Sequence, residues 1–247
     1  MNNSEILLTG GSGRLGTELR ELLKGISAPS SSELDITQSS SVDAAFKKYA
    51  PKLVVHAAAY TNVLKAETDR EGCWRVNVEG TRNIVRAALQ GTVPVIHIST
   101  DYVFWGDTGN YSESDTPGPV RNYYSLTKLV AEQIIPVLKE YLIIRTSFRP
   151  REWQYPVAFQ DVFTSQDYVD IIAPQVAEAI NSFKKIAPGI LHIGTERKSV
   201  YELAVRRKPD VKAAFKKDAN VELPDDISLN CEKWAALKAE FAKQEIH

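Results

Sequence analysis

The sequence predicts an α/β fold with a doubly wound parallel sheet, and three observations carry this prediction. Short apolar runs recur at residues 6–8, 52–56 and 93–98, and runs of this kind suit buried parallel strands. Helical patterns separate these runs, as expected when helices connect parallel strands. The first run leads directly into a glycine-rich turn that opens a helix, the order of elements found in nucleotide-binding α/β units.

Composition excludes several classes of protein. The 247 residues are 43% hydrophobic and 25% charged, which is ordinary for a soluble globular chain. A net charge of −1 shows no bias toward nucleic acid or an anionic membrane, and no apolar run approaches the ~20 residues of a membrane span. Cys73 and Cys231 lack metal-ligand spacing. We therefore expect a cytoplasmic protein with reduced thiols and no metal, nucleic-acid or membrane partner.

The glycine-rich turn predicts a dinucleotide site. Gly10 can make the tight turn, Gly13 lets the backbone approach a pyrophosphate, and Gly16 lets the helix pack closely on the strand. The pyrophosphate would then lie at the helix N-terminus, where free N–H groups and the helix dipole favour an anion. Ser12, Arg14 and Leu15 complete the loop and are expected to line the cofactor.

The chain after the second strand, expected near residues 25–28, bears on the choice of cofactor. An NAD site usually places a carboxylate there, on the ribose 2′-hydroxyl. Here residues 29–32 are one proline and three serines, and the first carboxylate is Glu33. The sequence therefore favours NADP(H), with Arg14 and serine hydroxyls on the 2′-phosphate, and NAD(H) is the alternative. Asp35 is placed either to accept from the adenine or to cap its own loop.

Thr100, Tyr124 and Lys128 are candidates for acid–base catalysis. Thr100 follows an apolar run, at the sheet edge where open α/β folds bind ligands. Tyr124 and Lys128 are four apart in a helical pattern and share a face, whereas Tyr123 is five from Lys128. An ammonium near a phenol favours the phenolate, so we expect Lys128 to lower the pKa of Tyr124.

Three histidines, at positions 56, 97 and 192, lie within or at the end of apolar, strand-like runs. We interpret all three as core or sheet-end histidines without a ligand role.

Several motifs together resemble the extended short-chain dehydrogenase/reductases. The string from Ser99 to Phe104 narrows the resemblance to the dTDP-4-dehydrorhamnose reductase (sugar-nucleotide reductase) group. The similarity runs from residue 6 to about residue 148. Leu64 and Trp105 depart from the group, which usually has acidic residues at both positions. The motifs are Thr-Gly-x-x-Gly-x-x-Gly at 9–16, Ala-Ala-Ala-Tyr-Thr at 57–61, Val-Asn-Val-Glu-Gly-Thr at 76–81, Ser-Thr-Asp-Tyr-Val-Phe at 99–104 and Tyr-x-x-x-Lys at 124–128.

The resemblance implies roles for the matching residues. Thr100, Tyr124 and Lys128 would be the catalytic triad, and Tyr124 and Lys128 would also contact the cofactor, Lys128 through the nicotinamide ribose. The remaining implied contacts are Asp35 and Ile36 with the adenine, Ala57, Ala58 and Ala59 along the cofactor, and Thr100, Asp101 and Tyr102 on the substrate side.

Arg149 lies next to the expected mouth of the site, together with Arg151. A guanidinium there suits the diphosphate of a nucleotide sugar, and a solvated loop arginine is the alternative.

We expect a Rossmann-type NAD(P)-binding domain over residues 1–150. Residues 151–247 would hold returning sheet elements and a small, shortened C-terminal substrate lobe, with helices at 199–207, 210–217 and 232–245. The implied function is an oxidoreductase of dTDP-rhamnose biosynthesis, an NAD(P)H-dependent reductase of a 4-keto-6-deoxy sugar nucleotide. Hydride would pass to the keto carbon, with Tyr124 as proton donor. The alternatives are an NAD(P)-binding regulatory subunit without turnover, or a sugar-nucleotide epimerase or dehydratase. Pairing of two subunits as a homodimer is common in the superfamily.

Overall fold

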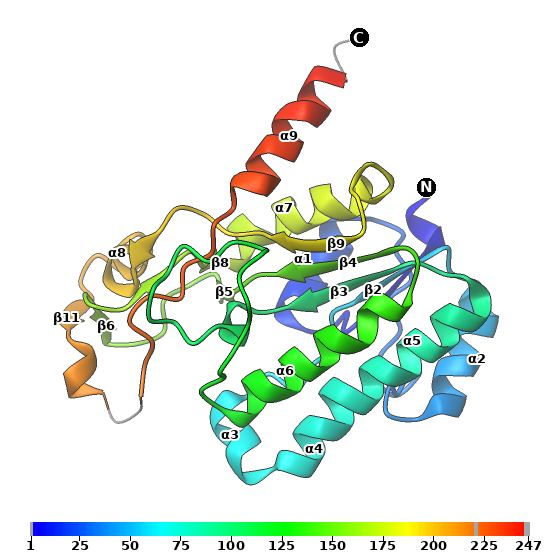
Figure 1. Cartoon of the computed structure of the whole chain (residues 1–247), viewed down its shortest axis with the longest axis horizontal. Coiled ribbons are helices and arrows are strands. Elements are labelled where there is room, and N and C mark those ends of the chain that lie inside the picture. The colour runs from blue at the N-terminus through cyan, green and yellow to red at the C-terminus, as the bar shows by residue number, and fades with distance from the viewer. Residues whose placement is uncertain (1, 220–221, 245–247) are drawn as a thin grey trace.

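A five-stranded parallel sheet forms the centre of the computed structural model, which describes residues 2–219 and 222–244 (Figure 1). The strand order is β1-β2-β3-β4-β9, and the carboxyl ends of all five strands meet at one edge. The predicted doubly wound α/β class is confirmed. The bounds are β1 (Ile6–Thr9), β2 (Leu53–His56), β3 (Val95–Ser99), β4 (Tyr141–Arg145) and β9 (Gly189–His192).

Helices cover both faces of the sheet because successive strand residues point to opposite sides. Ile6 and Leu8 belong to one hydrophobic cluster and Leu7 to the other. The first cluster packs against α1 (Arg14–Leu22), α7 (Val169–Asn181) and α9 (Glu232–Gln244). The second packs against α2 (Ser39–Tyr49), α5 (Gly80–Gly91) and the end of α6 (Tyr123–Ile134).

The strand expected near residues 25–28 is reduced to a single bridge between Ser27 and Leu7. Ser27 N donates to Ile6 O at 3.0 Å and Leu8 N donates to Ser27 O at 2.8 Å, so the chain runs beside β1 for one residue only. Pro29 has no backbone N–H to continue the pairing. The chain then turns toward the pocket described below.

The long helical pattern between β2 and β3 is divided into segments. It consists of α3 (Val63–Thr68), α4 (Arg70–Trp74), a π-helical turn (Arg75–Glu79) and α5. Asp69 separates the first two, because its carboxylate accepts from Gly72 N at 3.1 Å and so caps α4.

Between β4 and α7, where every residue is described, the chain forms four short strands and no helix, and the shortening of this region remains a prediction. These are β5 (Phe148–Arg149), β6 (Val157–Phe159), β7 (Phe163–Thr164) and β8 (Asp167–Tyr168). After β9 come β10 (Lys198–Ser199), α8 (Val200–Val205) and β11 (Lys212–Ala214). β10 pairs with β7, and β11 pairs with β6. The helix predicted at 210–217 is therefore wrong. Those at 199–207 and 232–245 correspond to α8 and α9, and residue 245 lies outside the described residues.

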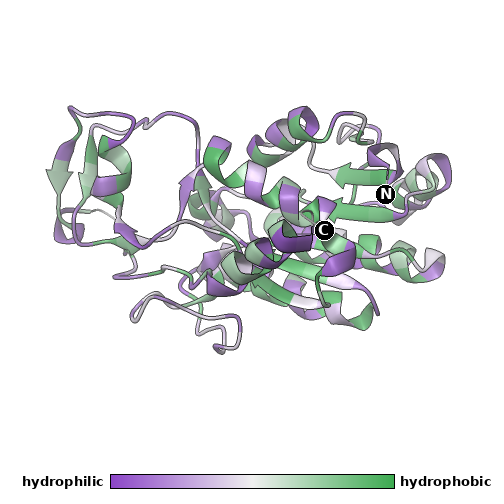
Figure 2. Cartoon of the chain, turned by 90° about the horizontal axis from the view of Figure 1, so that it is seen from above, coloured by the Kyte–Doolittle hydropathy of each residue, from purple (hydrophilic) through white to green (hydrophobic). Residues whose placement is uncertain are grey.

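These pairings form a small lobe beside the main body, seen from above in Figure 2. Its core consists of Trp153, Ala158, Val162, Val200, Ala204 and Val211. Hydrophobic residues follow the central strands, and polar residues dominate the outer turns of the helices (Figure 2). Within the described parts of the chain, no helix is both long and apolar enough to cross a membrane.

Candidate active site

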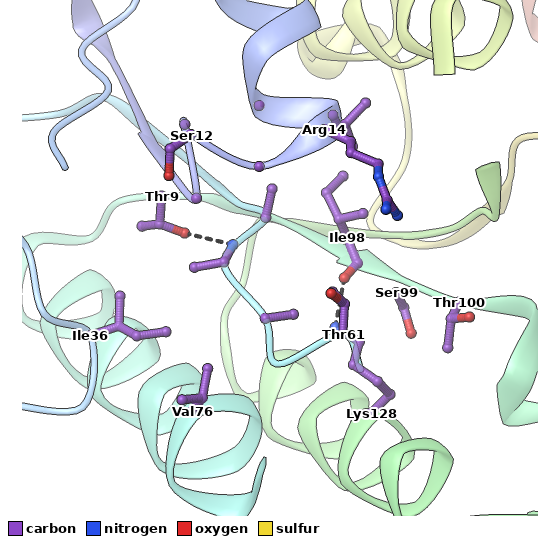
Figure 3. Close-up of a pocket in the computed structure, with 18 of the residues that line it drawn as sticks. Thr9, Ser12, Arg14, Ile36, Thr61, Val76, Ile98, Ser99, Thr100 and Lys128 are labelled. Atoms are coloured by element: carbon purple, nitrogen blue, oxygen red, sulfur yellow. Dashed lines mark hydrogen bonds between the residues drawn. The ribbon is translucent and has the colours of Figure 1, made fainter. Parts of the chain in front are cut away.

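A pocket of about 520 Å³ opens at the carboxyl edge of the sheet (Figure 3). It extends from the glycine-rich loop after β1 to the residues that follow β3. Nearly all the residues that the sequence singled out line it, although they come from five different segments of the chain. They are Gly10, Ser12, Gly13, Arg14, Leu15, Gly16, Asp35, Ile36, Ala57, Ala58, Ala59, Thr100, Tyr102, Tyr124 and Lys128.

The glycine-rich loop leaves no room for side chains at two of its positions. Gly10 has a φ of +74°, and a Cβ there would lie 2.7 Å from Ala58 N. A Cβ on Gly16 would lie 2.2 Å from Gly10 O. α1 begins after Gly13 with no side-chain cap, so the N–H groups of its first turn remain available to a ligand in the pocket. This cradle fits the phosphates of a dinucleotide.

Ser31, Asp35 and Ile36 line the far end of the pocket. The Asp35 carboxylate accepts from Thr37 N at 2.9 Å and Thr37 Oγ1 at 2.8 Å, so it also stabilises its own turn. Ser30 is turned toward Glu33, whose carboxylate accepts from Ser30 N and Ser30 Oγ, each at 3.0 Å. These bonds lower the pKa of Glu33. Of the serines at 30–32, only Ser31 lines the pocket.

Arg14 and Ser12 point to different parts of the pocket although they are two positions apart. Figure 3 shows the Arg14 guanidinium on the side of Ile98, while Ser12 and Ile36 lie on the opposite side. Arg14 is thus oriented toward the middle and the Thr100 end of the pocket rather than toward the loop at residues 29–37.

Thr100 and Asp101 form a hydrogen-bonded pair just beyond β3. Thr100 Oγ1 accepts from Tyr102 N at 3.2 Å and donates to Asp101 Oδ1 at 3.0 Å, which fixes its rotamer. Asp101 is 1% exposed and does not line the pocket, unlike Thr100 and Tyr102. Burial raises the pKa of Asp101 to about 6, against the effect of hydrogen bonds from Thr100 and Ser147.

Tyr124 and Lys128 lie on one face of α6, which begins after Asn122. The Asn122 side chain accepts from Ser125 N at 2.8 Å and caps the helix. Burial, followed by the nearby Asp101 carboxylate, raises the pKa of Tyr124. The net shift is upward and Lys128 is not among its causes, so the pKa of Tyr124 does not show the lowering expected from Lys128. Burial also lowers the pKa of Lys128 to about 8.

Arg149 and Arg151 differ in their contacts. Arg151 Nε and Nη2 donate to the two oxygens of Glu18 at 2.8 and 2.7 Å, so that guanidinium is already paired. Arg149 stacks on Trp153 and Tyr155, with Cζ 5.3 and 5.9 Å from the ring centroids. It does not line the pocket, but its charge acts on Tyr102, which does.

No role was assigned from the sequence to a further set of lining residues, although some of them, such as Thr9, Thr61 and Ser99, lie within the motifs quoted above. Thr146, Ser147 and Phe148 follow β4 at the same sheet edge as Thr100, so the strand-end rule that found Thr100 could have found them too. Val76 begins the motif at 76–81, which could have pointed to it, whereas we see no sequence signal for Val63 on α3. The missed residues are Thr9, Gly11, Pro29, Leu34, Thr37, Thr61, Val63, Val76, Ile98, Ser99, Thr146, Ser147 and Phe148.

The known proteins to which the chain is similar in sequence and in structure include several dTDP-4-dehydrorhamnose reductases. The chain is 31% identical to a dTDP-4-dehydrorhamnose reductase of Aggregatibacter actinomycetemcomitans over 182 residues, 70% of this chain and 62% of that protein. It thus spans just under two thirds of that relative's length.

Two solved structures are similar over most of their length. A dTDP-4-dehydrorhamnose reductase from Bacillus anthracis in complex with NADP is 26% identical, with a TM-score of 0.81 over 94% of this chain and 90% of that one. A hypothetical dTDP-4-dehydrorhamnose reductase from Sulfolobus tokodaii is 31% identical, with a TM-score of 0.80 over 94% and 93%. A sequence model described as the RmlD substrate binding domain matches residues 4–207. The chain therefore belongs to the RmlD substrate-binding domain family.

Proposed function

We propose that this chain is an NAD(P)H-dependent reductase of a 4-keto-6-deoxy sugar nucleotide. One observation carries the proposal: Thr100, Tyr124 and Lys128 line one end of a pocket whose other part is the glycine-rich loop. The named relatives, dTDP-4-dehydrorhamnose reductases, support the same substrate class.

The glycine-rich loop and the open first turn of α1 would hold the cofactor diphosphate, and Asp35 with Ile36 would meet the adenine. When bound, the reduced nicotinamide supplies a hydride to the keto carbon. Thr100 Oγ1 would orient the keto oxygen. Tyr124 would donate its phenolic proton to that oxygen as the C–O⁻ charge develops, and the Lys128 ammonium would stabilise the phenolate that remains.

The electrostatics of the pocket suit a proton donor. A raised pKa keeps Tyr124 protonated at neutral pH before substrate binds. A Lys128 pKa of about 8 leaves the amine mostly protonated at pH 7. Activity should therefore fall as the pH rises above about 8, because Lys128 loses the charge that stabilises the phenolate.

NADP(H) is the cofactor we favour, since Pro29 and Ser31 stand where an NAD site usually has a carboxylate. Ser31→Asp tests this, because a carboxylate would repel a 2′-phosphate and lower the NADPH:NADH ratio of kcat/KM. Arg14→Ala should weaken binding of both cofactors equally, given that its guanidinium faces the Ile98 side of the pocket. A selective loss of NADPH binding in Arg14→Ala would instead assign Arg14 to the 2′-phosphate.

Arg149 would bind the diphosphate of the nucleotide sugar at the mouth of the pocket. Its guanidinium has an aromatic platform and a buried, unbonded Nε. Arg149→Leu should raise the KM of the sugar nucleotide at least tenfold and leave NADPH binding unchanged. Arg151→Leu is the matched control, because Arg151 is already paired with Glu18.

The deciding experiment is loss of NADPH absorbance on adding a dTDP-4-keto-6-deoxy sugar. Tyr124→Phe should lower kcat by a factor of ~10²–10⁴, as expected for loss of a general acid. Tyr123→Phe is the control, because Tyr123 precedes Tyr124 on α6 and does not line the pocket. Lys128→Ala should also lose activity. If NADPH binds and no sugar nucleotide is reduced, the reductase proposal is wrong, and a regulatory binding subunit becomes the better explanation.

A further inference from the structure

The Lys128 ammonium has a defined set of hydrogen-bond partners. Lys128 is 2% exposed, and an ammonium carries three donor hydrogens. One is donated to Ile98 O at 2.8 Å, and His97 Nε2 lies 3.3 Å from Nζ (Figure 3 shows the first contact). Since two of its hydrogens are directed at these acceptors, the ammonium has one hydrogen left to donate to a ligand in the pocket that Lys128 lines.

His97 lies in the middle of β3 with an incomplete set of partners. It is 1% exposed, and its Nδ1 is buried without a hydrogen bond to any of the residues that the structure describes. Burial, then the charges of Lys128 and His56, keeps the pKa of His97 well below its usual range, so the ring is neutral. A neutral ring that accepts at Nε2 carries its proton on Nδ1, and that N–H then has no acceptor. A buried donor without a partner is a cost to folding.

The other two buried sheet histidines have partners on both ring nitrogens. His56 Nδ1 lies 2.8 Å from Thr9 Oγ1, and Nε2 lies 3.1 Å from Thr81 Oγ1. His192 Nδ1 lies 3.0 Å from Tyr111 O, and Nε2 lies 3.4 Å from Arg145 Nη1. All three are buried in the sheet, as expected from the sequence. Within the described residues His97 is the one with a ring nitrogen that lacks a partner, and it is also the one in contact with Lys128.

We propose that His97 is a positioning residue for the reaction: its neutral Nε2 accepts from the Lys128 ammonium and, with Ile98 O, directs the remaining N–H into the pocket. The role rests on the proposed function, because the reductase step needs Lys128 charged and oriented. The other ionisable groups that act on Lys128 are Glu132 on the same helix and Cys73 on α4, and the charge of Lys128 in turn acts on His56 on β2. None of these three has a hydrogen bond to Nζ among the described residues.

Three variants test the role. His97→Leu removes the acceptor while keeping an apolar side chain of comparable size. His97→Gln presents an amide oxygen near the position of Nε2. His56→Leu is the matched control on the neighbouring strand, since it removes a buried histidine whose ring lies 5.3 Å from that of His97 and leaves the acceptor of Lys128 in place.

Losing an acceptor makes the ammonium easier to deprotonate. In His97→Leu the pKa of Lys128 and the alkaline limb of the kcat profile should both move down by about one unit. At pH 8, kcat should fall about fivefold, because the protonated fraction of Lys128 drops from about one half to about one tenth, with KM for the sugar nucleotide changed less than threefold. His97→Gln should restore the pKa of Lys128 and the alkaline limb of the kcat profile to their wild-type values. His56→Leu should leave both unchanged.

The pKa of Lys128 can be read without turnover, by NMR of protein with ¹³C-labelled lysine side chains, the signal being assigned with Lys128→Arg. A lowered pKa in His97→Leu with an inactive wild type would keep the contact in which His97 holds Lys128 charged and would reject the reductase proposal. Equal shifts in His97→Leu and His56→Leu, or none in His97→Leu, would overturn the role. If His97→Leu does not fold, His97→Met against His97→Gln makes the same comparison.

Discussion

At the residue scale, Asp101 combines nearly complete burial with an ionisable side chain. Its pKa of about 6 in the folded protein exceeds the usual value of 3.8, so the folded state binds the proton more tightly than the unfolded state does. Between these two values, stability from this group falls as the pH rises. Asp101→Asn removes the ionisation and keeps an oxygen acceptor for Thr100. The free energy of unfolding of Asp101→Asn minus that of wild type should therefore be larger at pH 7 than at pH 4. We expect this difference to increase by on the order of 2 kcal/mol between the two pH values.

Urea unfolding at a series of pH values measures this difference. The lowered pKa values of the sheet histidines make stability rise with pH, the opposite of the effect of Asp101. Because wild type and variant share these histidines, their contribution cancels in the difference at each pH. Asp210→Asn, on the exposed surface, is the control. A constant difference between Asp101→Asn and wild type from pH 4 to pH 7 would contradict the prediction.

Residue positions were easier to predict than residue environments. Tyr124 and Lys128 could be paired from sequence because a helix fixes the spacing of residues four apart. The direction of Arg14 and the pKa of Tyr124 could not, since both depend on neighbours brought in by other segments. The same holds for His97, whose unpaired nitrogen is visible only once β2 and α6 are in place.

At the scale of the element, α6 is tied to the sheet by a buried ion pair. Glu132 and Arg145 are each 1% exposed, and Arg145 Nε and Nη2 donate to the Glu132 carboxylate at 3.0 and 2.8 Å. Ser99 Oγ donates to the same carboxylate at 2.5 Å. Glu132→Gln should lower the free energy of unfolding by about 3–5 kcal/mol, because it leaves the Arg145 charge buried and uncompensated. Denaturant unfolding measures the loss.

The double variant Glu132→Gln/Arg145→Met separates the charge from the packing. It should recover part of the loss, because neither side chain then carries an unpaired charge. The pair of Lys184 with Glu140, whose side chains are 68% and 59% exposed, is the control, and Glu140→Gln should have little effect on stability. Equal losses in Glu140→Gln and Glu132→Gln would show that burial of the pair is unimportant.

The elements that the sequence predicted correctly are those with a strong local pattern. The apolar runs became strands β1, β2 and β3, and the pattern at 232–245 became α9. Residues 210–217 failed because helix propensity there is outweighed by pairing with a distant strand. Lys212 N donates to Pro156 O at 3.1 Å, and Gln160 N donates to Ala214 O at 2.9 Å. Nothing in the sequence around β11 indicates that it pairs with β6.

At the scale of the whole molecule, α9 joins the end of the chain to the main core. Trp234 is 1% exposed, lies against Phe241 and donates from Nε1 to Gln175 Oε1 at 3.2 Å on α7. Trp234→Ala should lower the free energy of unfolding by about 3–5 kcal/mol, the usual cost of truncating a buried aromatic residue. Circular dichroism in a denaturant series measures this.

The control for Trp234→Ala is Ala236→Ser, an exposed position on the same helix. A loss below about 1 kcal/mol in Trp234→Ala would show that α9 is held only weakly against α7.

The small lobe is built from strands that lie far apart in the sequence. Ala158 pairs with Ala213, and Thr164 pairs with Lys198. In the sequence, α7 and β9 lie between the two strands of each pair. Each pairing closes a long loop, and loop closure costs less once the intervening elements are already docked on the sheet. The lobe should therefore be the last part to assemble and the first to detach. Substitutions in it would speed unfolding and leave the folding rate almost unchanged.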